Sequence, residues 1–163
     1  PGDTIIRPKD TAKLDAEGEL VVIIKDRCRN VSTEDAMQHV LGYTCGNDVS
    51  ARDWQREDRN WWRAKSADTF SPAGPFIVTD IDPHNVRLSA RINGAEVQGE
   101  STKYLIFDIP TLVSFVSRFV TLEPGDMIYT GTPGEPGEMK DGDVCEIEIE
   151  GIGVLSNPVE LEH

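Results

Sequence analysis

The order of apolar and polar residues predicts a domain built mainly from β-strands. Residues 19–24 form a short apolar run rich in β-branched side chains, which is typical of a strand buried on both faces. Residues 86–98 alternate on both sides of Asn93-Gly94, the dipeptide that most strongly indicates a tight hairpin. Further strands are expected at residues 127–130, at residues 143–149 and, as a short last strand, after Gly151 to Gly153, with a Gly/Pro loop at residues 131–142.

Two segments have the spacing of amphipathic helices. Residues 32–35 offer an N-cap and an acidic first turn, and apolar residues then recur at helical spacing up to Gly42. After Asp108, a proline in the first turn is followed by an apolar stripe that ends at Val120, which predicts the longest helix. With many strands, two or three short helices and no βαβαβ order, the chain is predicted to form one α+β domain, mainly β, of a β-roll or barrel-like kind.

Composition narrows the expected partners and location. The 163 residues include 29 acidic and 16 basic side chains, a formal net charge of −13, which repels nucleic-acid phosphates and anionic membrane surfaces. We therefore expect no nucleic acid and no membrane as partner, and an anionic substrate would need a metal ion, a lysine or an arginine beside it. The three cysteines are widely spaced and no long apolar run is present, so we expect reduced thiols in a cytoplasmic protein.

Glu17 and Glu19 are the first candidates for a metal site. If residues 16–20 are extended, side chains two positions apart project from the same face of the strand. Mg²⁺ and Mn²⁺ prefer carboxylate oxygens of this kind and retain open positions for a substrate. The same spacing also occurs on solvated strand edges of acidic proteins, so periodicity alone leaves both interpretations open.

Two later segments add polar groups to this picture. Residues 42–55, interpreted as a loop, contain Asp48 and Arg52 beside several glycines, a density that is typical of a functional site. Residues 62–66 contain Lys65, whose ammonium group suits a carboxylate partner.

Six short stretches, in a fixed order and spacing, carry a family likeness. They are Glu17-Gly18-Glu19-Leu20, Gly42-Tyr43-Thr44-Cys45-Gly46-Asn47-Asp48-Val49-Ser50-Ala51-Arg52-Asp53, Lys65-Ser66, Gly74-Pro75, Leu122-Glu123-Pro124-Gly125-Asp126 and Thr130-Gly131-Thr132-Pro133. Together they resemble the fumarylacetoacetate hydrolase family, in its acylpyruvase and isomerase-like branch. The likeness continues to Asn157-Pro158-Val159, nearly the whole chain, and several independent motifs in register make it specific.

The resemblance implies a fold, a metal and a set of site residues. The fold would be the β-roll of this family, usually as a homodimer, with Mg²⁺ or Mn²⁺ bound and a small oxo-acid as substrate. The resemblance implies that the metal is bound by Glu17, Glu19 and Asp48. It implies catalytic roles for Lys65 and Gln55, and substrate contacts for Thr130 and Arg52.

The resemblance also implies a range of reactions. The preferred hypothesis is a Mg²⁺-dependent hydrolase or lyase that cleaves a carbon–carbon bond in acylpyruvate-type oxo-acids, with the metal stabilising the developing enolate charge. An isomerase or an oxaloacetate-type decarboxylase is the alternative within the family. A catalytically silent domain that binds a ligand or dimerises is the alternative from another class.

The chain departs from the hydrolytic pattern in one respect. Hydrolytic relatives have a His and a Glu, in an H-x-x-E arrangement or paired through space, that activate water, and none of the histidines here precedes an x-x-Glu. His39 is interpreted as a helix-surface residue and His84 as a turn residue. Residues 1–160 are accordingly interpreted as the family's catalytic domain without its N-terminal part, and residues 161–163 as the remnant of a purification tag.

Overall fold

The strands form three sheets in a computed structural model that describes all 163 residues. The strands are β1 (Ile5–Arg7), β2 (Leu14–Ala16), β3 (Gly18–Ile24), β4 (Val40–Asn47), β5 (Ser50–Ala51), β6 (Ala73–Val78), β7 (Arg87–Ile92), β8 (Ala95–Ser101), β9 (Met127–Tyr129), β10 (Gly137–Met139), β11 (Val144–Ile149) and β12 (Gly153–Leu161). The largest sheet has the order β1-β12-β11-β7-β8, the second β6-β4-β3-β9, and the smallest β10-β2-β5. The predicted α+β class, mainly β, is confirmed.

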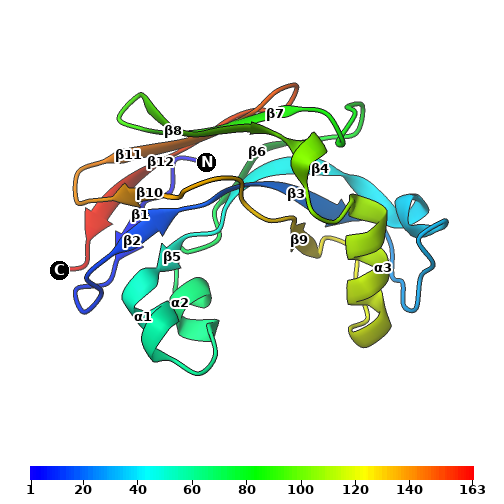
Figure 1. Cartoon of the computed structure of the whole chain (residues 1–163), viewed down its shortest axis with the longest axis horizontal. Coiled ribbons are helices and arrows are strands. Elements are labelled where there is room, and N and C mark those ends of the chain that lie inside the picture. Colours follow the sequence, from blue (N-terminus) through cyan, green and yellow to red (C-terminus); the bar gives the residue numbers. More distant parts are fainter.

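The helices are short and lie at two ends of the strands. They are α1 (Arg52–Glu57), α2 (Trp62–Ser66) and α3 (Ile109–Phe119), with single 3₁₀ turns η1 (Ala36–His39) and η2 (Thr102–Tyr104). In Figure 1, α1 and α2 lie together below one end of the strands and α3 lies below the other end. None of these helices has the length and apolar character needed to span a bilayer.

The second sheet supplies β3, the longest strand in which every residue is buried. Every residue of β3 is buried, because the strand is enclosed on both faces and pairs with β4 on one side and β9 on the other. Leu20, Val22 and Ile24 join the main apolar core, which confirms the sequence prediction for residues 19–24. This strand therefore gives Glu19 a rigid support.

Local sequence signals explain the hairpin and the longest helix. β7 and β8 are joined at Asn93 and Gly94, whose φ angles of 53° and 79° fit the left-handed positions of a tight type I′ turn. The first turn of α3 is capped by Asp108, whose carboxylate accepts a hydrogen bond of 2.9 Å from the N–H of Thr111. Both predicted elements are confirmed.

The predicted helix that follows residues 32–35 is wrong. Only the single turn η1 forms there, and Val40 and Leu41 begin β4 instead. The apolar spacing was compatible with a helix, but pairing with β3, from Ile24 opposite Val40 onward, decides the structure.

Three other expectations need correction. Residues 42–55 are not a loop, because they contain most of β4, all of β5 and the start of α1. The expected Gly/Pro loop at residues 131–142 includes β10, which pairs with β2. The last strand is the longest rather than short, since β12 has nine residues and pairs with both β11 and β1. The strands in these three segments each form by pairing with a strand that the local pattern does not report.

Candidate metal centre

The carboxylates of Glu17, Glu19 and Asp48 meet where β3 and β4 lie side by side. Glu19 belongs to β3, Glu17 lies between β2 and β3, and Asp48 follows β4 directly. One oxygen from each carboxylate lies within 4.8 Å of the others. The two glutamates are only 7% and 4% exposed, so the alternative that they lie on a solvated strand edge is wrong.

Main-chain contacts fix this arrangement. The N–H of Glu17 donates to the side-chain oxygen of Asn47 at 2.9 Å, and the carbonyl of Glu17 accepts from the N–H of Asp48 at 2.9 Å. Asn47 is itself buried and its amide group also contacts Cys145. Hydrogen bonds therefore connect the start of β3 to the end of β4 at the point where the carboxylates converge.

Lys65 and Arg52 supply positive charge on one side of the cluster. The ammonium nitrogen of Lys65, from α2, lies 2.5 Å from Glu17 and 2.6 Å from Asp48. Arg52, at the start of α1, donates to Glu17 through one terminal nitrogen, and its Nε donates to Asp15 at 2.8 Å. The two short helices thus present their cations to the end of β3.

Glu19 has no such cationic partner. No lysine or arginine forms an ion pair with it, and the N–H of Gly131 donates to its Oε2 at 2.7 Å. Burial raises the pKa of Glu19 to about 8, against the effect of the Gly131 hydrogen bond and with the help of the nearby Asp48 and Glu17 charges. Without a further cation this carboxylate is therefore largely protonated at neutral pH.

The other two carboxylates differ from Glu19 in their electrostatics. Burial alone would raise the pKa of Glu17, but the hydrogen bonds from Lys65 and Arg52 outweigh it and hold that pKa below its ordinary value. For Asp48, burial prevails over the contact with Lys65 and raises the pKa. Burial therefore opposes the charged form of all three carboxylates, and only Glu17 and Asp48 have a cation to offset it.

The donor set fits a hard divalent cation. Three carboxylates on a common point, one of them without a cationic partner, are oxygen ligands of the kind that Mg²⁺ and Mn²⁺ take in proteins. Glu19, which forms no ion pair, would lose its proton on binding such an ion and add a negative charge that neither Lys65 nor Arg52 neutralises. Glu17, Glu19 and Asp48 are the residues that would hold such an ion.

A second group of hydrogen bonds fixes the segment that carries Gly131. The side-chain amide of the buried Gln98 accepts from the N–H of Gly18 at 3.0 Å and donates to the hydroxyl of Thr132 at 3.0 Å and the carbonyl of Pro133 at 2.7 Å. The hydroxyl of Thr132 donates to the carbonyl of Gly18 at 2.9 Å. Residues 131–133, which contact Glu19 through the N–H of Gly131, are therefore hydrogen-bonded to Gly18 of β3, directly and through Gln98.

The predicted catalytic and substrate residues lie around this centre. Gln55 accepts from Arg52 at 2.8 Å, one turn further along α1, and Arg52 contacts the carboxylates rather than open solvent. The hydroxyl of Thr130 donates to the carbonyl of Leu20 at 2.9 Å. Their proposed roles toward a substrate stay predictions, as does the role of Lys65.

Sequence reasoning missed four residues that shape the centre. They are Asp15, Asn47, Gln98 and Gly131. Asn47 and Gly131 lie inside the stretches that carried the family likeness, so attention to every polar or glycine position in those stretches would have found them. For Asp15 and Gln98 the sequence gives no local signal.

The histidines and cysteines lie outside the cluster. His39 ends η1, and its Nδ1 lies 2.5 Å from Asp26, so it has a carboxylate partner of its own. The N–H of His84 donates to Asp82 at 3.1 Å in a turn, as predicted for that residue. All three cysteines are buried and unpaired.

The fold and the three carboxylates define an α+β domain, mainly β, with a candidate divalent-metal centre. Comparison with known proteins identifies its family. Residues 1–160 match the family described as fumarylacetoacetate (FAA) hydrolase, C-terminal. The chain belongs to the fumarylacetoacetate hydrolase family. Those of its relatives whose names state an activity are enzymes.

Two relatives illustrate the range of similarity. An uncharacterized protein of Methanocaldococcus jannaschii is 51% identical over 160 residues, which cover 98% of this chain and 68% of that protein. The mitochondrial oxaloacetate tautomerase of Xenopus laevis is 43% identical over 171 residues, which cover 98% of this chain and 54% of the tautomerase.

Two solved structures have the same fold. The 5-carboxymethyl-2-hydroxymuconate delta-isomerase of Mycobacterium smegmatis superposes with a TM-score of 0.98 at 48% identity, over 100% of this chain and 65% of that chain. The maleylpyruvate hydrolase of Sphingobium sp. SYK-6, in complex with manganese(II) and pyruvate, superposes with a TM-score of 0.90 at 34% identity, over 100% of this chain and 61% of that one. The chain thus spans roughly 54% to 68% of the length of these four proteins.

Proposed function

We propose that Glu17, Glu19 and Asp48 hold one Mg²⁺ or Mn²⁺ ion and that the centre acts on a small oxo-acid. The observation that carries this proposal is the convergence of three carboxylates, two of them buried, with Glu19 lacking a cationic partner. Buried negative charge without a counter-charge costs free energy, and a divalent ion removes that cost. The manganese(II) and pyruvate bound by the maleylpyruvate hydrolase support the choice of metal and substrate class.

The side chains of the chain have distinct tasks in this proposal. A divalent ion held here would supply the positive charge that polarises the carbonyl group of the oxo-acid as negative charge develops on it. Lys65, between Glu17 and Asp48, adds a fixed positive charge at the same place and holds both carboxylates in position. Arg52 contacts both Glu17 and Gln55, and would thereby hold the Gln55 amide group beside the centre for a hydrogen bond to substrate or water.

The preferred reaction is hydrolytic cleavage of a carbon–carbon bond in an acylpyruvate, which consumes one water molecule and yields pyruvate and a carboxylic acid. It requires a leaving group whose negative charge is stabilised, and the positive charge at this centre provides that. The hydrolase name and the bound pyruvate of the Sphingobium relative support it.

A second candidate is tautomerisation, isomerisation or decarboxylation of a related oxo-acid. The names of two relatives favour it, since the isomerase and the tautomerase are 48% and 43% identical to this chain, against 34% for the hydrolase. In these reactions negative charge also develops on the carbonyl oxygen beside the carboxylate group of the oxo-acid, so they would use the same residues.

One assay separates these candidates. The chain is incubated with acetylpyruvate, and separately with oxaloacetate, in Mg²⁺, in Mn²⁺ and in EDTA, and products are identified by NMR. Pyruvate and acetate that appear together only with metal support cleavage, whereas a changed keto–enol ratio or loss of carbon dioxide without acetate supports the second candidate. Glu17→Gln should abolish either activity, and Arg63→Gln, on the same helix as Lys65, should not. No metal-dependent conversion of any substrate contradicts the proposal.

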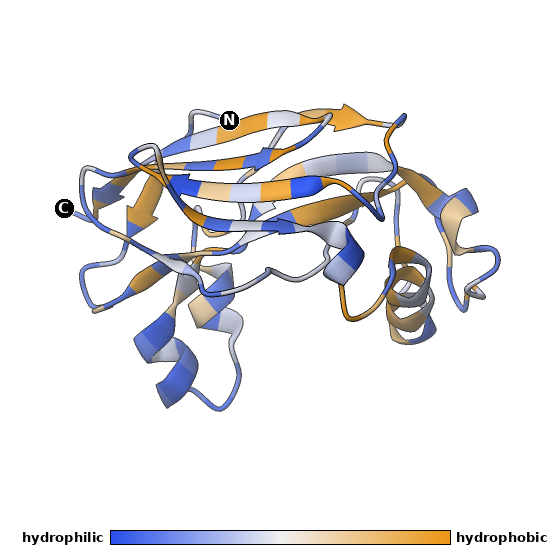
Figure 2. Ribbon diagram, turned by 45° about the horizontal axis from the view of Figure 1, so that its top comes forward, coloured by the Kyte–Doolittle hydropathy of each residue, from blue (hydrophilic) through white to orange (hydrophobic).

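Self-association is a further part of the proposal. The apolar side chains of Ile106, Phe107, Phe115 and Phe119 are 91%, 59%, 58% and 64% exposed. They gather before and along α3, which is largely orange in Figure 2, whereas α1 is mainly blue. Exposed apolar groups of this size favour a second copy of the chain as partner, in a homodimer. Analytical ultracentrifugation that shows only monomer over a wide concentration range contradicts it.

A further inference from the structure

Tyr129, the last residue of β9, lies on the same face of the second sheet as Glu19. β9 pairs with β3 so that Tyr129 is opposite Val21, and side chains two positions apart, as those of Val21 and Glu19 are, share a face. In the pairing of β3 with β4, Gly46 is opposite Glu19, and a Cβ atom at Gly46 would lie 2.6 Å from a ring carbon of Tyr129. The ring therefore occupies the space that a side chain at position 46 would fill, beside Glu19.

The hydroxyl group of Tyr129 forms a hydrogen bond at this place. It donates to the carbonyl of Ser71 at 3.1 Å and also lies 3.4 Å from the carbonyl of Pro72. Burial raises the pKa of Tyr129, and the negative charges of Asp48 and Glu19 raise it further, so the hydroxyl keeps its proton at neutral pH. This proton therefore connects the end of β9 to the segment before β6.

That segment holds both chain neighbours of Asp48. The N–H of Asn47 donates to the carbonyl of Pro72 at 3.1 Å, and the N–H of Val49 donates to the carbonyl of Phe70 at 3.0 Å. Residues 70–72 belong to no helix or strand. The backbone position of Asp48 therefore depends on where these three residues lie.

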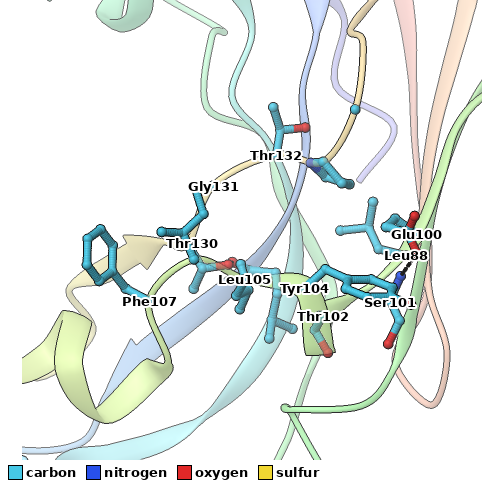
Figure 3. Close-up of a pocket in the computed structure, with 14 residues that line it drawn as sticks. Leu88, Glu100, Ser101, Thr102, Tyr104, Leu105, Phe107, Thr130, Gly131 and Thr132 are labelled. Atoms are coloured by element: carbon cyan, nitrogen blue, oxygen red, sulfur yellow. Dashed lines mark hydrogen bonds between the residues drawn. The ribbon is translucent and has the colours of Figure 1, made fainter.

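On the other side, Tyr129 leads directly into the segment that contacts Glu19. The N–H of Gly131 donates to Oε2 of Glu19 at 2.7 Å. In Figure 3, Thr130, Gly131 and Thr132 lie along one side of a cleft of about 400 Å³, and a Cβ atom at Gly131 would have no heavy atom within 4 Å. Because packing on the cleft side does not hold Gly131 in place, its position depends on hydrogen bonds and on the residues next to it in the chain.

We propose that Tyr129 is a positioning residue of the candidate metal centre, which joins the support of Glu19 to the support of Asp48 and holds the two carboxylates at the separation that one ion requires. The inference rests on the proposed function, because it takes both carboxylates as ligands of one ion. It adds a task for a residue that forms no hydrogen bond with either carboxylate.

Tyr129→Phe tests this task, because it keeps the ring and removes only the hydroxyl group. Binding of Mn²⁺ to the folded variant, followed by electron paramagnetic resonance of the free ion, should be about threefold to tenfold weaker than in the native chain, the effect of one hydrogen bond. A purely structural role would lower the stability of the variant and leave Mn²⁺ binding to its folded form unchanged.

Tyr43→Phe is the matched control. It removes the same group from β4 of the same sheet, but Tyr43 lies near Asp82 rather than near the cluster, so Mn²⁺ binding should not change. Native Mn²⁺ binding by Tyr129→Phe, or equal weakening in both variants, overturns the inference and leaves the proposed function intact. Failure of the native chain to bind Mn²⁺ overturns both.

Hydrogen exchange in EDTA examines the connection without metal or substrate. In Tyr129→Phe the N–H groups of Asn47, Val49 and Gly131 should exchange about threefold to tenfold faster than in the native chain. The N–H groups between β7 and β11, in the largest sheet, should exchange as before. Unchanged exchange at the first three groups, or equal acceleration in both sheets, overturns the inference.

Discussion

The ammonium nitrogen of Lys65 lies 2.5 Å from Oε2 of Glu17 and simultaneously 2.6 Å from Oδ2 of Asp48. One cation on a five-residue helix thus connects residues from two different strand ends. All three side chains are at most a quarter exposed, so solvent screens this contact only in part. Lys65 is therefore placed to act on two of the proposed metal ligands at once.

Replacing Lys65 by Met separates these effects. Without metal, Glu17 and Asp48 lose their shared partner, and the free energy of unfolding should fall by about 2 kcal/mol. Turnover should fall by at least about 100-fold because the fixed charge at the reacting oxygen is lost. Mg²⁺ should bind at least as tightly as before, since no ligand is removed and a competing cation is gone.

Urea denaturation, steady-state kinetics and Mg²⁺ titration measure these three quantities. Lys25→Met is the matched control, because Lys25 is exposed and forms no ion pair. If Lys65→Met has normal turnover, Lys65 has only a structural role.

The metal-free protein should become less stable as the pH rises from about 4.5 to about 8. The pKa of Glu19 is raised from 4.5 in the unfolded chain to about 8 in the folded protein. In this pH range the folded state therefore binds more protons than the unfolded state, so its stability is fully present below about pH 4.5 and is lost toward pH 8. Glu19 alone should contribute roughly 2–4 kcal/mol to this loss.

Glu19→Gln, which imitates the protonated carboxyl group, provides the control for this effect. The variant should be more stable than the native metal-free chain at pH 8 and should lose this part of the pH dependence. Urea denaturation in EDTA between pH 5 and 8 measures both. Parallel curves for the two proteins would show that Glu19 does not titrate in this range.

Gln98→Leu should loosen the segment that holds Glu19. The substitution removes the contacts to Gly18, Thr132 and Pro133 and leaves the buried N–H of Gly18 without a partner. We expect a loss of about 2–3 kcal/mol in the free energy of unfolding and weaker Mg²⁺ binding. Hydrogen exchange of residues 130–134 should accelerate, whereas Gln38→Leu, at an exposed position, should change neither stability nor exchange.

Gly46→Ala should disturb the same segment through packing. A Cβ atom at Gly46 would overlap a methyl group of Val21 and lie 2.6 Å from a ring carbon of Tyr129, the residue before Thr130. We expect a loss of about 1–3 kcal/mol, measured by thermal unfolding. Adding Val21→Ala should recover part of that loss, and a double variant as unstable as the sum of both single changes would contradict the packing argument.

The sequence predicts those parts of the fold that have strong local signals. The apolar run of β3, the Asn93-Gly94 hairpin and the capped helix α3 each depend on residues close together in the chain. The start of β4 directly after η1, and the strand β10, depend on pairings with β3 and β2, which no local pattern reports.

The candidate site was predictable in a similar way. The family likeness, rather than the spacing of Glu17 and Glu19, predicted that Asp48 and Lys65 belong to the same site as the two glutamates. The hydrogen bonds of Gln98 to Gly18, 80 residues away, and of Arg52 to Asp15 arise only from tertiary packing. No pattern along the chain shows that Lys65 and Arg52 pair with Glu17 or Asp48 and leave Glu19 without a cation.

The central claim is that these three carboxylates bind a divalent metal ion, and titration with Mn²⁺ followed by electron paramagnetic resonance tests it most directly. The signal of free Mn²⁺ reports how much metal the chain binds, independently of any substrate. The account predicts one Mn²⁺ per native chain, and binding weaker by at least about tenfold in Glu19→Gln and in Asp48→Asn. Equal Mn²⁺ binding by the native chain and both variants, or no binding by the native chain, would contradict it.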